Sequence, residues 1–275
     1  MNKSLKRFLS VGVLATAISG QAWAETFTFG VVPQQSATKL AKVWGPVLKH
    51  LEDKTGMQFQ FATATDIPTF EQRLMDGVYD FAYMNPYHFT FFNEHKGYTA
   101  LAHRADKRIQ GLLVTRTDSS ITELSQLEGK EVAFPSPAAF AASMVPRGEL
   151  AKMGITITPR YVSSHDSVYL GVSREFFLAG GGIGRTFNNS KDDIKSQLKV
   201  LWKTAEYTPH AFANHPRVDA DIAKKVSAAL ADMGNSEEGK AALSGLGIQS
   251  LRAANDSDWD DVRALKLTLL DSLLD

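Results

Sequence analysis

The sequence predicts an α/β protein of two lobes with a ligand cleft between them. Strand-like and helix-like segments alternate along the chain, a rhythm that favours mainly parallel sheets covered by helices. The rhythm runs through 26–104 and restarts at 109, which indicates two units. The chain passes between the units near 104–110 and again near 203–210. Two crossings between two lobes form a hinge about which a cleft can close.

The first unit is predicted to contain four strands and three helices. In the longest helix, apolar residues from Leu40 to Leu51 recur at helical spacing, and Gly56 ends the pattern. The other two helices end at a glycine in the same way. Strands are expected at 26–32, 57–64, 79–84 and 98–104, and helices at 37–56, 67–77 and 86–97.

The second unit repeats the alternation, and a helical tail follows it. Its strands are expected at 109–116, 130–134, 155–162 and 195–203, with a glycine-rich strand at 175–184 that runs into a flexible turn. Its helices are expected at 121–129, at 138–154 with an interruption near Pro146, and from Ser164 onward. The tail should form helices at 218–234, 236–247 and 258–274 that rejoin the first unit. The predicted lobes are therefore 25–106 with 207–275, and 107–206.

The first 24 residues have the order of a secretory signal peptide. A basic start precedes an apolar run at 8–18, and Ala22 and Ala24 fit cleavage after Ala24. The run is shorter than the roughly 20 residues that span a bilayer, so a membrane anchor is the weaker alternative. No later segment predicts a membrane span. We therefore expect a soluble protein of the periplasm.

Composition excludes several classes of function. The sequence has no cysteine, which excludes disulfides, thiolate metal sites and a cysteine nucleophile. Basic and acidic residues number 30 each, and removal of three basic residues with the signal peptide lowers the formal charge from 0 to −3. A weakly acidic chain lacks the basic surface that nucleic-acid binding requires. We expect a monomer without a cofactor, in which local groups hold any bound anion.

No motif commits the chain to catalysis or to a metal. The glycine-rich run at 179–186 lacks the Lys and Ser/Thr of a P-loop, and neither a dinucleotide fingerprint nor a nucleophile elbow occurs. These glycines predict a backbone that passes close to another element, and a ligand-bordering turn that aims Arg185 at an anion is the alternative. His88 and His95 share a helix face but form no zinc motif. No catalytic residue and no metal ligand is therefore expected.

Polar groups follow two predicted strands at the end where α/β folds bind ligands. Tyr83 and Asn85 lie at the exit of one strand, where helix capping by Asn85 is the alternative. Ser136 precedes Pro137, which suits the first helical position, so the amides of Ala138 and Ala139 would be free at a helix start. Free amides and the helix dipole attract an anion, whereas a capping role for Ser136 is the alternative.

A further helix start is predicted at 163–167. Ser164 is a candidate cap, and Ser167 lies in the first turn. His165 next to Asp166 could hold a proton near neutral pH and donate to an oxyanion. A capping Asp166 beside an uninvolved His165 is the alternative.

The order of these segments resembles the phosphate-, phosphite- and phosphonate-type substrate-binding proteins of ABC importers. The resemblance covers nearly all of 25–275 and rests on the signal peptide followed by 29–56, 79–89, 135–146, 163–167 and 198–203. It implies the type II periplasmic-binding-protein fold, with two hinge strands and a closing cleft. It also implies a ligand held by helix-start amides and hydroxyls of the second lobe and covered by a tyrosine of the first.

The resemblance assigns roles to particular positions. Tyr83 and Asn85 match the first-lobe strand exit, His165 and Asp166 match a His–acid pair, and the helix at 138 matches the main anion-binding helix. The chain also departs from the pattern. Where several phosphonate binders have a Ser-Thr-Ser-like triplet, this chain has Ala139, Phe140 and Ala141. Ile67 replaces a first-lobe tyrosine, and Thr208 lies near the place of an acid.

These departures remove hydroxyl donors, so we expect a pocket with fewer hydrogen-bond donors. They also remove a partner for an ammonium group, which argues against an aminoalkylphosphonate ligand. The leading hypothesis is a periplasmic solute-binding protein that delivers a small oxyanion to an ABC permease and its ATPase. A ligand-sensing subunit of a membrane histidine kinase is the second hypothesis. An exported hydrolase is the third, and the missing motifs count against it.

Overall fold

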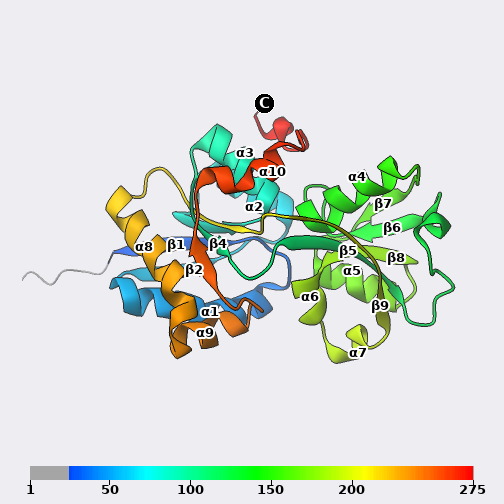
Figure 1. Ribbon diagram of the computed structural model, residues 1–275, viewed down its shortest axis with the longest axis horizontal. Helices are drawn as coiled ribbons and strands as arrows, with labels where there is room; N and C mark the ends of the chain where they lie inside the picture. The colour runs from blue at the N-terminus through cyan, green and yellow to red at the C-terminus, as the bar shows by residue number, and fades with distance from the viewer. Residues whose placement is uncertain (1–24, 275) are drawn as a thin grey trace, which may run out of the picture.

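The computed structural model describes residues 25–274, and the predicted signal peptide at 1–24 lies outside them. Two sheets, each covered by helices, form the two halves of the molecule in Figure 1. The predicted α/β architecture of two units is confirmed. The lobe bounds predicted from the sequence stay a prediction, although each sheet falls within them except for the last residue of β9, Tyr207.

The first sheet has six strands in the order β11-β4-β10-β3-β1-β2. β1 pairs in parallel with β2 and β3, whereas β10 lies antiparallel between β3 and β4. The sequence did not predict β10, which returns from the second unit, and this sheet is therefore mixed. The strands are β1 (Thr26–Val31), β2 (Gln58–Ala62), β3 (Phe81–Met84), β4 (Thr99–Arg104), β10 (Ala211–Asn214) and β11 (Leu251–Ala253).

The second sheet has five strands in the order β7-β6-β8-β5-β9. β6 is parallel to β7 and β8, while β5 is antiparallel to β8 and β9. β5 leaves the first lobe and β9 returns to it, and the two pair along their whole length. The strands are β5 (Ile109–Arg116), β6 (Glu131–Phe134), β7 (Thr158–Tyr161), β8 (Ala179–Ile183) and β9 (Leu198–Tyr207).

The helices follow the predicted spacing in most places. Ser36 caps the longest helix, since its Oγ accepts from the Lys39 amide at 3.4 Å. In the first half lie α1 (Ala37–Thr55), α2 (Ile67–Met75), α3 (Pro86–Lys96), α8 (Ala220–Asp232), α9 (Glu237–Ser244) and α10 (Asp260–Arg263). In the second lie α4 (Val145–Lys152), α5 (His165–Ser173), α6 (Gly184–Asn188) and α7 (Asp192–Lys195). No helix within residues 25–274 combines the length and the apolar character that crossing a membrane requires.

Four predicted segments differ from the structure. The helix expected at 121–129 is reduced to the 3₁₀ turn η1 (Leu124–Leu127). The helix expected from Ala138 starts at Phe140 with the π-helical turn η2 (Phe140–Met144), which continues into α4 without a break at Pro146. The helix expected at 258–274 divides into short pieces, because the chain turns at Lys266 (φ 50°) and brings Leu270 back onto Tyr87. The glycine-rich segment does not form a flexible turn, since Gly180, Gly181 and Gly182 lie in the buried strand β8 and Gly184 begins α6.

The main hydrophobic core joins the two lobes. It fills the first lobe with aromatic side chains around Trp44, Phe29 and Phe81. Ala138–Ala142 of the second lobe belong to the same cluster of buried side chains. Two smaller clusters lie on the faces of the second sheet. The start of the second-lobe helix is therefore packed against the first lobe.

Candidate ligand-binding site

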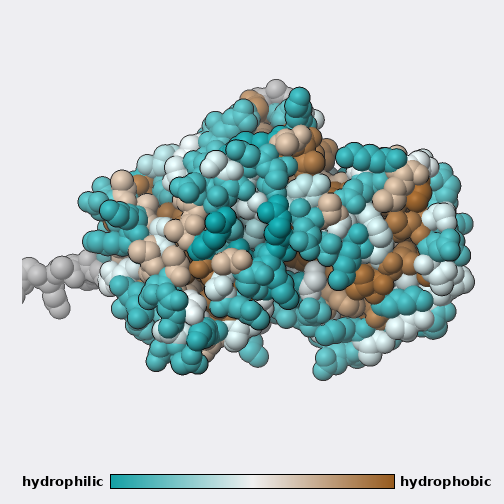
Figure 2. All heavy atoms as spheres, in the orientation of Figure 1, coloured by the Kyte–Doolittle hydropathy of each residue, from teal (hydrophilic) through white to brown (hydrophobic). Residues whose placement is uncertain are grey.

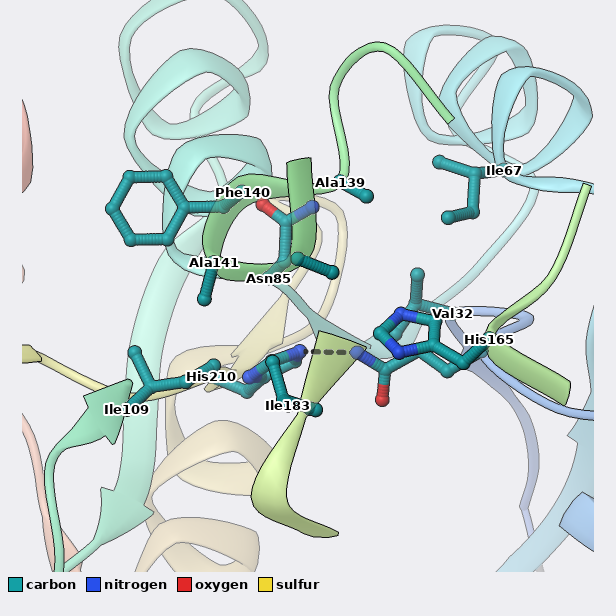
Figure 3. Close-up of a pocket in the computed structure, with 12 residues that line it drawn as sticks. Val32, Ile67, Asn85, Ile109, Ala139, Phe140, Ala141, His165, Ile183 and His210 are labelled. Carbon is teal, nitrogen blue, oxygen red and sulfur yellow. Dashed lines mark hydrogen bonds between the residues drawn. The ribbon is translucent and has the colours of Figure 1, made fainter. Parts of the chain in front are cut away.

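A small cavity lies between the lobes and is shown in Figure 3. Its volume is about 10 Å³, which is close to the room that one water molecule needs. Strand ends and helix starts of both lobes enclose it. Four lining side chains are polar: Gln34, Asn85, His165 and His210. The others are apolar: Val32, Ile67, Ile109, Ala139, Phe140, Ala141, Ala142 and Ile183.

The second-lobe helix begins at this cavity with unused amide groups. Ala139 precedes the helix with an extended backbone, and its carbonyl accepts from the amides of Ser143 (2.7 Å) and Met144 (3.2 Å). Within residues 25–274, the amides of Phe140, Ala141 and Ala142 have no hydrogen-bond acceptor. First-turn amides point out of the N-terminal end of a helix and carry a partial positive charge there. This end of the helix therefore favours an anion.

Two glycines let the helix start lie directly on the second sheet. A Cβ atom on Gly111 would lie 2.0 Å from the carbonyl oxygen of Ala141. A Cβ atom on Gly181 would lie 2.0 Å from the carbonyl oxygen of Ala142. Any side chain at either position would displace the helix start from the cavity. The close backbone approach that the glycine-rich run predicted is confirmed at Gly181.

The predicted alignment of Ser136 and Pro137 with the helix start is wrong. Because the helix begins at Phe140, three residues after Pro137, Ala139 rather than Ser136 precedes it, and Pro137 lies outside it. The amide of Ala139 donates to the Ser136 carbonyl at 3.4 Å and is not free. The Ser136 side chain is buried, has no hydrogen-bond partner among the described residues and does not line the cavity.

Asn85 connects the two lobes at the cavity wall. Its Oδ1 accepts from the amide of His88 at 2.8 Å and so caps α3. Its Nδ2 donates to the carbonyl of Ala138 at 3.1 Å, although Ala138 itself does not line the cavity. The capping interpretation of Asn85 is therefore confirmed, whereas its role in ligand binding stays a prediction.

His165 begins α5 and is almost completely buried. Its amide donates to the carbonyl of Gln34 at 3.1 Å, and its Nδ1 lies 2.9 Å from Thr186 Oγ1. Burial, together with the Arg185 guanidinium, lowers the pKa of His165 to about 3. The expectation that His165 holds a proton near neutral pH is therefore wrong. In its neutral form it offers the cavity one ring nitrogen, Nε2.

Gln34, His210 and Arg185 form a chain of contacts beside the cavity. The Gln34 Nε2 lies 2.9 Å from His210 Nε2, drawn as the dashed line in Figure 3, and Arg185 Nη2 donates to Gln34 Oε1. Burial first, and then the charge of Arg185, lowers the pKa of His210 well below its usual value, so its Nε2 accepts from the Gln34 amide. Arg185 Nη1 is buried without a partner in the described chain.

Tyr83 lies behind this chain rather than on the cavity wall. Its ring stacks on the His210 ring with 5.1 Å between the centroids and an interplanar angle of 15°. Trp44 and Phe212 pack on its other sides. Tyr83 thereby fixes the orientation of His210.

The acidic member of the predicted His–acid pair faces away from His165. Asp166 Oδ1 accepts from Gln35 Nε2 at 3.2 Å and lies 3.8 Å from Lys39 Nζ. Both partners belong to the first lobe, so Asp166 links the two lobes outside the cavity. Ser167 is exposed, and its amide and hydroxyl contact Ser164, the cap of α5. Asp166 and Ser167 do not line the cavity.

Sequence reasoning missed six side chains that line the cavity: Val32, Gln34, Ile109, Ala142, Ile183 and His210. Gln34 follows β1, so the criterion that identified Asn85, a polar side chain after the end of a predicted strand, could also have identified Gln34. His210 directly precedes β10, a strand that the apolar pattern of the sequence did not predict. Ile109 begins β5 and Ile183 ends β8, and because these strands are antiparallel both residues lie at the same end of the pair. Neither carries a polar group that would indicate a site.

Residues 29–259 match the family model described as ABC transporter, phosphonate, periplasmic substrate-binding protein. The chain is 23% identical to the phosphate-import protein PhnD of Mycolicibacterium smegmatis, over 92% of this chain and 91% of that protein.

Two solved structures are similar to the whole fold. One is a binding-protein component of an ABC phosphonate transporter from Pseudomonas aeruginosa, with a TM-score of 0.81, 19% identity, and coverage of 88% of this chain and 86% of that chain. The other is PhnD1 from Prochlorococcus marinus in complex with methylphosphonate, with a TM-score of 0.78, 16% identity, and coverage of 88% and 97%. At these identities the structures establish the fold.

Proposed function

The chain belongs to the periplasmic substrate-binding proteins of phosphonate ABC transporters, and from this premise we propose that it closes on a small phosphorus oxyanion in the interlobe cavity. The resemblance to this family and the type II periplasmic-binding-protein fold, both predicted from the sequence, are confirmed. The identity of the ligand and the partner at the membrane are the new elements of the proposal.

The free amides of Phe140, Ala141 and Ala142 are the observation that carries the proposal. They meet at a buried helix start whose dipole adds a partial positive charge. Hydrogen bonds to a charged acceptor contribute about 1.5–3 kcal/mol each, and more where water is excluded. Three such donors suit the oxygens of phosphate, phosphite or methylphosphonate.

The remaining cavity wall supports a small ligand without a positively charged group. Asn85 and neutral His165 add polar atoms, and Arg185 adds a positive charge behind Gln34. No carboxylate belongs to the described cavity wall, so an ammonium substituent would lack a partner. Ile67, Ile109 and Ile183 make the rest of the wall apolar. The cavity must widen for any of these ligands, and rotation about the hinge at β5 and β9 would provide the room.

Closure stabilises the bound state through contacts that the ligand makes with both lobes. The closed form would then present the ligand to an ABC permease and ATPase at the inner membrane, with the chain acting as a monomeric carrier. A membrane histidine kinase is the other partner to test, by asking which membrane protein the liganded form binds.

Titration calorimetry tests the proposed ligand class directly. Protein refolded from denaturant to remove retained ligand is titrated with phosphate, phosphite, methylphosphonate, 2-aminoethylphosphonate, sulfate and acetate. Binding should be measurable for at least one of the first three and weaker for 2-aminoethylphosphonate. If none of the phosphorus oxyanions binds while sulfate or acetate does, the proposed ligand class is wrong.

A further inference from the structure

A second, larger groove lies beside the cavity at the hinge. Its volume is about 840 Å³, and the two crossing segments contribute much of its wall. Ile109, Ile183 and His210 line both the cavity and the groove. These three side chains are therefore the partition between the two spaces.

The groove carries an excess of positive charge. Six of its lining side chains are basic and two, Asp106 and Glu206, are acidic. Three of the basic groups have a carboxylate partner: Arg104 with Asp106, Arg108 with Asp261, and Arg252 with Asp258. The other three, Lys107, Arg185 and Lys203, have no carboxylate within 4 Å in the described chain. The groove therefore favours an anion.

Arg185 links the groove to the cavity. Arg185 lines the groove, and its guanidinium donates to Gln34, which lines the cavity. Its Nη1 is buried without a partner among the described residues, and a buried charged donor normally has one. An acceptor at this position would satisfy it. The partition beside Arg185 is apolar at Ile109 and Ile183, so it suits methylene groups.

We propose that the hinge groove is a subsite for an anionic substituent of the ligand. The full ligand would then have an oxyanion head at the Phe140–Ala142 amides, a short alkyl linker along Ile109 and Ile183, and a second anionic group near Lys107, Arg185 and Lys203. This class comprises carboxyalkylphosphonates and related diacids. The inference rests on the proposed function, since the head must first bind in the cavity.

Calorimetry with three ligands of similar length tests the subsite. 3-Phosphonopropionate carries an anionic tail, propylphosphonate an apolar tail and 2-aminoethylphosphonate a cationic tail. We expect 3-phosphonopropionate to bind about fivefold more tightly than propylphosphonate, because two exposed lysines each add a modest attraction. Its advantage should shrink as salt rises, since exposed charges are screened.

A pair of double variants locates the effect. Lys107→Ala with Lys203→Ala should remove the preference for 3-phosphonopropionate and leave the affinity for methylphosphonate unchanged. Lys130→Ala with Lys152→Ala removes the same charge from exposed positions outside the groove and should keep the preference.

The outcomes separate this inference from the proposed function. Equal affinity for 3-phosphonopropionate and propylphosphonate, with methylphosphonate still bound, overturns the subsite alone. A preference that survives in the Lys107/Lys203 variant also overturns it. Failure of every phosphonate and of phosphate to bind overturns the proposed function and the subsite together.

Discussion

Asn85 Nδ2 donates a hydrogen bond of 3.1 Å to the carbonyl of Ala138, and this contact ties α3 of the first lobe to the loop before the second-lobe helix. The same side chain caps α3 through its Oδ1. One residue therefore contributes both to the cap of a first-lobe helix and to the contact between the lobes, and substitutions can separate the two.

Asn85→Asp should weaken ligand binding about tenfold while keeping the unfolding temperature close to that of the wild type. Aspartate caps helices as well as asparagine does, but it cannot donate to Ala138 and would set a carboxylate against a carbonyl. Calorimetry and thermal unfolding measure the two effects. Asn85→Ala is the matched variant, and it should lose about 1 kcal/mol of stability as well as affinity. Undiminished affinity in Asn85→Asp would show that the interlobe bond does not contribute to closure.

Gly181→Ala should destabilise the second lobe by about 1–3 kcal/mol and abolish ligand binding. The new Cβ atom would lie 2.0 Å from the Ala142 carbonyl and 2.5 Å from the Phe134 ring, so the helix start must move. Gly184→Ala is the control, because a Cβ atom there meets nothing within 4 Å. Urea unfolding and calorimetry measure both variants. Full binding by Gly181→Ala would show that the position of the helix start is not critical.

The pH dependence of stability should report the buried His165. Its pKa is about 3 in the folded chain and about 6.5 in the unfolded chain, so the unfolded chain binds the extra proton between these values. Neutral His165 therefore makes its full contribution to the free energy of unfolding above about pH 6.5. This contribution is lost as the pH falls toward 3, by at most about 1.4 kcal/mol per pH unit. Burial also lowers the pKa of His210, so protonation of His210 in the unfolded chain likewise reduces stability as the pH falls.

His165→Asn should flatten the stability curve over this window relative to the wild type. Asparagine retains a polar atom near the position of Nδ1 but does not titrate. Urea unfolding at a series of pH values measures the slopes. Identical slopes in the two proteins would mean that His165 is accessible to protons in the folded chain.

Much of the architecture could be predicted from periodicity. The strands at Thr26–Val31 and Ile109–Arg116 and the helices at Ala37–Thr55 and Pro86–Lys96 lie where the apolar pattern and the glycines placed them. β10 was missed because its four residues are too few to show a period and its pairing partners come from far away in the sequence. The tail from 258 onward breaks because Leu270 packs on the first lobe, a tertiary contact that local propensity does not encode.

The site was predicted in outline but not in detail. Strand exits and helix starts identified Asn85, Ala139 and His165, which do line the cavity. The prediction that His165 holds a proton near neutral pH was wrong because packing from both lobes buries the ring and lowers its pKa, and this packing cannot be read from the local sequence. The start of the helix at the cavity was expected at Pro137 or Ala138 and lies at Phe140, because a proline that suits a first helical turn also suits the loop before one.

The central claim is that backbone amides, rather than side chains, hold the anion. Phe140 is the first helical residue and follows an extended Ala139, so proline fits its position and removes one amide hydrogen. Phe140→Ala loses the same ring, including its edge contact with Tyr207, but keeps that hydrogen. The difference between the two variants therefore isolates the amide.

Titration calorimetry of the two Phe140 variants with the tightest-binding oxyanion tests the claim most directly. Phe140→Pro should bind more than about tenfold more weakly than Phe140→Ala, the equivalent of at least about 1.5 kcal/mol for one charge-assisted hydrogen bond. The two variants should unfold at similar urea concentrations. Equal affinities at equal stability would contradict the claim and move the anion away from this helix start.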